Sequence, residues 1–77
     1  MKELLEILAK NLVEKPEMVD VTEKQNEDGT VVLELRVGEG DMGKVIGKQG
    51  RIAKAIRSVV KAAAIHADKR VVVEIVQ

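Results

Sequence analysis

The chain has 77 residues with no cysteine and no aromatic residue, and its formal net charge is zero. This composition excludes a disulfide framework, a thiolate metal site and the stacking of bases on aromatic rings. No apolar run has the length of a secretion signal or a membrane span, so we expect a cytoplasmic protein whose residues 1–77 form a single domain with a narrow stability margin.

The first expected element is an amphipathic helix. Leucine and isoleucine recur at helical spacing from Leu4 to Leu12, and Pro16 ends the pattern. The opposite arc mixes lysine with glutamate, whereas a helix that lies on a lipid surface is usually basic on that arc. The pattern therefore favours a helix that packs against the core over one that binds a membrane.

Two strands joined by a tight turn should follow. The residues from Met18 to Gln25 alternate between apolar and polar side chains, and so do those from Thr30 to Val37. Between them, the sequence Asn-Glu-Asp-Gly at 26–29 is typical of a hairpin turn. We expect an antiparallel hairpin with one buried face.

Two helices and a last strand are predicted for the second half of the chain. Glycines at 38, 40 and 43 break the strand pattern, and Asp41 stands where it can cap a short helix over Met42–Ile46. A longer helix is predicted over Arg51–His66 and a final strand over Arg70–Val76. The arc of the longer helix that should face the core contains Ile52, Ala55, Ile56, Val59 and Ala63.

The resulting order of elements, α-β-β-α-α-β, predicts a small α+β domain. The connection from the second strand to the third runs through two helices, so these strands should be parallel neighbours. The hairpin adds an antiparallel strand. We therefore expect a three-stranded mixed sheet with the helices packed on one face.

The most informative segment is the Gly-x-x-Gly turn between the two later helices. Glycine at both ends removes the Cβ atoms that would hold a ligand's backbone away, and the amides that open the next helix lack intrahelical partners. Such amides favour an anion, although glycine is also common where a helix simply ends. The candidate nucleic-acid-binding residues are Lys44, Val45, Ile46, Gly47, Lys48, Gln49, Gly50, Arg51, Ile52 and Lys54. The cations and amides would take phosphates, and the apolar side chains would face the bases or support the wall that does.

A basic stripe continues from this turn along the longer helix. Residues 1–42 hold five Lys/Arg and eleven Asp/Glu, giving −6, while residues 43–77 hold eight and two, giving +6. Like charges on one helix arc repel each other by about a few tenths of a kcal/mol per pair, so the stripe favours a nearby polyanion over an ordinary solvated surface. The stripe consists of Arg51, Lys54, Arg57 and Lys61.

Two other phosphate-binding patterns overlap the same region. Residues 38–43 read G-x-G-x-x-G, but no acidic residue stands about 20 positions further on, where a dinucleotide site holds the ribose. Residues 38–44 read G-x-x-x-x-G-K, but Val45 replaces the hydroxyl residue that would hold Mg²⁺. The remainder of the chain supports neither site.

Side chains suited to catalysis are scarce. The single histidine, His66, and the single serine, Ser58, lie too far apart on one predicted helix for a direct hydrogen bond. The carboxylates are scattered through the N-terminal half. We therefore expect a binding module with no catalytic residue, metal site or cofactor.

The wording of residues 41–57, DMGKVIGKQGRIAKAIR, carries a family resemblance. With the order of elements over the whole chain, it resembles a type II KH domain, whose G-x-x-G loop clamps a nucleic-acid backbone, and in particular the small stand-alone bacterial KhpA proteins. The resemblance implies single-stranded RNA binding as an RNA chaperone or post-transcriptional regulator. It also implies self-association as a homodimer and pairing with a larger KhpB (Jag)-like KH protein. One departure is Ala53, where KH domains often carry a branched aliphatic residue, so the shape of the wall beside the bases stays open.

The outer face of the expected sheet supports a different class of function. An exposed apolar patch on this face would mark a protein-interaction or dimerisation module with no nucleic acid of its own. The two functions are compatible, because pairing raises the avidity of a weak single domain. The expected patch consists of Met18, Val32, Val72 and Val76.

Overall fold

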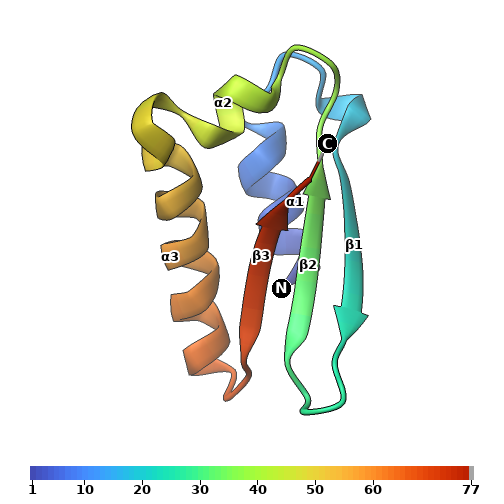
Figure 1. Cartoon of the computed structure of the whole chain (residues 1–77), viewed down its shortest axis with the longest axis vertical. Coiled ribbons are helices and arrows are strands. Elements are labelled where there is room, and N and C mark those ends of the chain that lie inside the picture. The colour runs from blue at the N-terminus through green and yellow to red at the C-terminus, as the bar shows by residue number, and fades with distance from the viewer. Residues whose placement is uncertain (77) are drawn as a thin grey trace.

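The computed structural model describes residues 1–76 and has the expected order of elements (Figure 1). They are α1 (Lys2–Lys10), a 3-10 turn η1 (Pro16–Met18), β1 (Asp20–Gln25), β2 (Val31–Arg36), α2 (Met42–Ile46), a second 3-10 turn η2 (Lys48–Gly50), α3 (Arg51–His66) and β3 (Val71–Ile75). The predicted α+β class and the α-β-β-α-α-β order are confirmed.

The strands form a three-stranded mixed sheet in the order β1-β2-β3. β1 runs antiparallel to β2, with Val21 opposite Leu35, and β2 runs parallel to β3, with Leu33 opposite Val73. The hairpin turn also forms as predicted. Gly29 has a φ of +89°, and the Thr30 N–H donates to the Asp28 carboxylate at 2.9 Å, which lowers the pKa of Asp28 from its usual value.

One face of the sheet is covered by helices, as Figure 1 shows. Alternate residues of the strands point to this face, and α1 and α3 contribute their buried side chains to it. The hydrophobic core consists of Leu5, Ala9, Val21, Leu33, Leu35, Val45, Ile56, Val60 and Val73. A core of aliphatic side chains alone therefore holds the two layers together.

The start of the first strand differs from the prediction. Met18 lies in η1 and not in a strand, and β1 begins at Asp20. Pro16 occupies the first position of η1, where its fixed φ suits a helical turn, and the Val19 N–H donates back to its carbonyl at 3.2 Å. The first helix itself ends at Lys10, before the predicted end at Pro16, and the proline instead starts a short turn that delays the strand.

The buried arc of α3 also differs from the prediction. The fully buried residues are Ala53, Ile56, Val60 and Ala64, and of the predicted set only Ile56 is among them. Ala55 and Val59 are exposed, because α3 is rotated about its axis so that a neighbouring arc meets the core. Alanine and valine stand on both arcs, so periodicity alone could not distinguish them.

Asp41 does not cap α2 with its side chain, contrary to the prediction. Asp41 is 2% exposed, and its carboxylate accepts the Glu14 N–H at 3.2 Å and the Lys15 N–H at 3.1 Å. The Lys15 ammonium in turn donates to the Glu39 carbonyl at 3.2 Å. Asp41 therefore joins the start of α2 to the segment that follows α1, two parts of the chain that are distant in sequence.

Replacement of Asp41 tests this link. Asp41→Ala would leave two backbone N–H groups without their charged acceptor, so we expect the free energy of unfolding to fall by about 2 to 4 kcal/mol. Urea denaturation followed by circular dichroism measures the change. The exposed Asp20 serves as the matched control, and Asp20→Ala should change stability by less than about 0.5 kcal/mol. Equal effects of the two substitutions would contradict the proposed role of Asp41.

Candidate nucleic-acid interface

The Gly-x-x-Gly turn is built from backbone conformations that L side chains rarely adopt. Gly47 has φ +75° and ψ 174°, Gln49 has φ 58° and ψ 24°, and Gly50 has φ +75° and ψ 14°. The Gly50 N–H donates to the Gly47 carbonyl at 3.1 Å, and the Arg51 N–H donates to the Lys48 carbonyl. The amides of Lys48 and Gln49 open η2 ahead of these bonds, and the first amides of a helical turn lack intrahelical partners, so an anion can accept from them.

The two glycines of the turn are required for different reasons. A Cβ on Gly47 would lie 2.5 Å from Cγ1 of Ile52, so the chain passes directly against this side chain. A Cβ on Gly50 would meet no atom within 4 Å. Gly47 therefore permits a close approach within the protein, whereas Gly50 leaves open space on the outer side of the turn.

Cationic side chains surround this open side. Lys48, Arg51 and Lys54 are exposed, and within residues 1–76 none of them is paired with a carboxylate. The Arg51 guanidinium donates to Oε1 of Gln49 at 3.3 Å, which connects the middle of the turn to the start of α3. Three exposed cations thus stand at or directly after the turn.

Lys44 has a different environment from the other cations. Its ammonium lies 3.4 Å from the Glu14 carboxylate, and its side chain is 41% exposed. An incoming phosphate must compete with this carboxylate. Lys44 can therefore contribute less to the binding of an anion than Lys48 or Arg51.

The apolar candidates divide into core and surface. Val45 is fully buried, so it can support the wall but cannot contact a ligand. Ile46 is 37% exposed and Ile52 is half-buried, so these side chains are accessible beside the turn. Ala53 is buried, so the residue that departs from the usual KH pattern lies beneath the surface.

The charged flank of α3 lies next to β3. Arg57 donates from Nε to the Val73 carbonyl at 3.4 Å, which places this flank beside the sheet edge. Lys54 and Lys61 are exposed on the same flank. The basic stripe thus extends from the turn along the side of the helix that faces β3.

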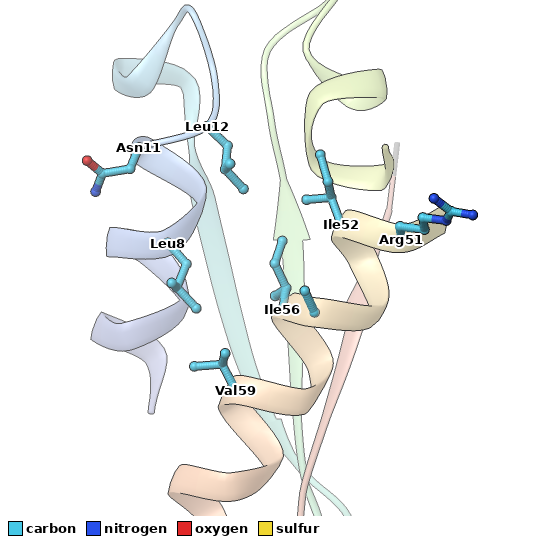
Figure 2. A pocket seen from close by; sticks show the side chains of 8 residues that line it. Leu8, Asn11, Leu12, Arg51, Ile52, Ile56 and Val59 are labelled. Atoms are coloured by element: carbon cyan, nitrogen blue, oxygen red, sulfur yellow. The ribbon is translucent and has the colours of Figure 1, made fainter. Parts of the chain in front are cut away.

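An apolar groove between α1 and α3 was not anticipated from the sequence. It has a volume of about 520 Å³, and Figure 2 shows Leu8 and Leu12 directed toward α3 while Arg51 points away. The other lining residues are Asn11, Ile52, Ala55, Ile56 and Val59. The sequence did contain a signal for this groove, because both helices carry more apolar residues than one buried arc requires.

The two alternative phosphate patterns lack a cradle. A Cβ on Gly38 would lie 3.0 Å from the Cβ of Met18, so the backbone there packs against η1 instead of facing a ligand. Within residues 1–76, no group of His, Asp or Glu side chains is placed to hold a metal ion. In the same range, no helix has the length and apolar character needed to cross a membrane.

The sheet topology and the turn together define a KH domain of the type II arrangement, in which the added helix and strand come first. A family model described as the KH domain of KhpA and KhpB matches residues 2–75, so the chain belongs to the KhpA/KhpB KH-domain family.

Several relatives share nearly the full length of the chain. It is 67% identical to the RNA-binding protein KhpA of Clostridium perfringens, over 99% of this chain and 100% of that protein. It is 49% identical to the RNA-binding protein KhpA of Aquifex aeolicus, over 100% of this chain and 96% of that protein.

Solved structures give the same fold at low identity. The Aquifex aeolicus Era Y63A variant bound to GDP.AlF4- is 21% identical with a TM-score of 0.65, and the match covers 96% of this chain but 28% of that one. A structure of Era in complex with MgGDPNP and nucleotides 1506–1542 of 16S ribosomal RNA is 22% identical with a TM-score of 0.60, with the same coverage. The chain thus corresponds in fold to about a quarter of these longer proteins.

The different surroundings of Gly47 and Gly50 predict different losses in the free energy of unfolding when each is replaced by alanine. Gly47→Ala combines a Gly-only backbone conformation with the contact against Ile52, so we expect a loss of at least about 3 kcal/mol. Gly50→Ala meets only the strain of the left-handed region, about 1 kcal/mol. Thermal or urea denaturation compares the two variants.

A double variant separates the steric part of this effect. In an Ile52→Ala background the contacts with Cγ1 and Cδ1 are removed and the contact with Cβ at 2.9 Å remains, so Gly47→Ala should cost less there than in the parent chain. An unchanged cost would show that Cγ1 and Cδ1 of Ile52 do not contribute to the requirement for glycine at this position.

Proposed function

We propose that this chain binds single-stranded RNA and that the turn at residues 47–50 clamps the sugar-phosphate backbone. The observation that carries the proposal is the open space beside Gly50, next to the first amides of η2 and to cations that within residues 1–76 are not paired with a carboxylate. The name of its relatives, RNA-binding protein KhpA, supports the same assignment.

The proposed mechanism assigns a role to each group of residues. The amides of Lys48 and Gln49 and those of the opening turn of α3 donate hydrogen bonds to phosphate oxygens, which the positive end of the helix dipole also attracts. Lys48, Arg51 and Lys54 add charge, and Lys44 contributes after it separates from Glu14. Ile46 and Ile52 offer apolar surface to the bases.

The proposed role is binding without catalysis, in the cytoplasm, with the chain acting as one KH domain. Phosphate contacts fix the register of a strand but carry no sequence information, so the clamp itself binds many RNAs. An affinity on the order of micromolar and a strong dependence on salt follow from so few charges. This behaviour suits an RNA chaperone or a post-transcriptional regulator.

Two negative charges placed in the turn test the clamp. Lys48→Asp combined with Gln49→Asp should abolish binding of a labelled single-stranded RNA, because carboxylates would stand where phosphates accept from amides. The fold should persist, since aspartate tolerates the left-handed conformation of residue 49. Fluorescence anisotropy measures binding, and circular dichroism verifies folding.

The chain offers a matched control for this experiment. Lys24 and Gln25 form the same dipeptide and are also exposed, but lie at the end of β1. Lys24→Asp with Gln25→Asp makes the same change in net charge and should reduce affinity by no more than about threefold. Binding retained by the folded turn variant, or lost equally in both variants, would contradict the clamp.

A second proposed function is protein docking, and the apolar groove between α1 and α3 favours it. The outer sheet face is less suitable than expected, because the Glu34 carboxylate lies 3.3 Å from Lys24 and 3.8 Å from Arg36 on that face. Met18 also lies outside the sheet. We propose a second copy of the chain as the occupant of the groove, with a KhpB-like KH protein as the alternative partner.

Two valines of equal exposure distinguish the surfaces. Val59 in the groove is 45% exposed and Val72 on the outer sheet face is 44% exposed. The substitution Val59→Asp places a charge in the groove and should convert a dimer to a monomer, as measured by sedimentation equilibrium. Val72→Asp should leave the dimer intact. The reverse result would place the interface on the sheet, and a monomeric parent chain would remove self-association.

A further inference from the structure

Within residues 1–76, the outer edge of β3 presents backbone groups that no other strand pairs. β3 is at the end of the sheet order, with β2 as its one neighbour in the sheet. The Val31 N–H donates to the Arg70 carbonyl at 2.9 Å, and the Val76 N–H donates to the Leu35 carbonyl at 2.9 Å. Because residues of a parallel strand alternate in the direction of their backbone groups, Val71, Val73 and Ile75 direct theirs away from β2.

Arg57 is attached to this edge. Its Nε–H donates to the Val73 carbonyl at 3.4 Å, across from α3 to β3. Within residues 1–76, no hydrogen bond or ion pair is formed by the side chains of Lys54 and Lys61, its neighbours on the stripe. Arg57 therefore has a preferred orientation, whereas the lysines are flexible point charges.

The position of Arg57 differs from that of the cations around the turn. Arg57 stands six positions after Arg51 on the α-helix, which is about 9 Å along the axis. A strand whose phosphates rest on the turn and which continues along this flank would bring a neighbouring nucleotide to Arg57 and the edge of β3. A base at that point can be recognised, because the outward-facing carbonyls of β3 lie beside the planar guanidinium of Arg57 with its N–H donors.

The donor pattern of this arrangement selects among bases. After the bond to Val73, the guanidinium retains the N–H groups of Nη1 and Nη2, which suit two adjacent acceptors. Guanine offers O6 and N7 as such a pair, and its N1–H and N2–H groups can donate to a carbonyl of the edge. Adenine has an amino group, which is a donor, beside N7. This amino group would face an N–H donor of the guanidinium and could not form a hydrogen bond with it.

We infer that Arg57 is a specificity-determining residue, which gives the RNA-binding surface a preference for guanine at the nucleotide beside β3. The inference rests on the proposed RNA binding and extends it, since the turn alone does not read sequence. A lysine at this position would keep the charge but lose the planar fork.

Single-base substitutions in a uniform RNA test the inference. We would measure the affinity of the parent chain for labelled seven-nucleotide uridine oligomers whose central base is uracil, guanine, adenine or cytosine. The guanine oligomer should bind about 10-fold more tightly than the uracil oligomer. A central 7-deazaguanine lacks only the N7 acceptor, so this oligomer should lose most of the gain without any change in the protein.

Protein variants supply the second arm of the experiment. The Arg57→Lys variant should bind every oligomer with nearly the affinity that the parent chain has for the uracil oligomer. The variant would then have lost the preference for guanine but kept RNA binding. Lys61→Gln is the control on the same flank and should weaken every oligomer by a similar factor. Equal binding of all oligomers by the parent chain, a preference for another base, or a guanine preference that survives Arg57→Lys would overturn the inference.

The same measurements distinguish the two proposals. The Lys48→Asp, Gln49→Asp variant should lose all the oligomers, whereas Arg57→Lys should lose only discrimination. Absence of binding by the folded parent chain would overturn both proposals. Unselective binding that depends on the turn would overturn the role of Arg57 alone.

Discussion

The close approach of Gly47 to Ile52 is the constraint on which the rest of the structure depends. With no room for a Cβ at residue 47, the backbone at the end of α2 passes directly against the Ile52 side chain at the start of α3. On one side of this junction Val45 is buried in the core, and on the other the amides of residues 48 and 49 open η2. A steric requirement within the fold therefore creates the surface that can receive an anion.

α3 connects the three surfaces that matter for function. One arc, with Ile56 and Val60, is buried against the sheet. A second arc carries the basic stripe along β3, where Arg57 reaches the Val73 carbonyl. A third arc, with Ala55 and Val59, lines the groove beside α1. The basic and apolar arcs lie on different sides of one helix, but they meet at its start, where Arg51 and Ile52 line the groove and also lie beside the turn.

Much of the fold was predictable because its elements have strong local signals. The alternation in both hairpin strands, the turn at 26–29 and the short helix over Met42–Ile46 needed no tertiary information. Asp41 shows where such signals end. Its position before a helix predicts a cap, yet its carboxylate accepts the amides of Glu14 and Lys15, which the sequence places far away. A buried acceptor takes the donors that the packed chain brings to it, and spacing along the chain does not reveal them.

By itself, the sequence determined the α+β class, the order of elements, the Gly-x-x-Gly turn and the concentration of positive charge around and after it. These depend on periodicity, on glycine and on composition, all of which act over a few residues. The tertiary structure alone decided that α3 buries Ala53, Ile56, Val60 and Ala64, that Val45 is inaccessible, and that Arg57 rests on the edge of β3. The reason is the rotation of each helix about its axis, which is set by packing against the sheet and α1 and leaves no trace in the spacing of small apolar residues.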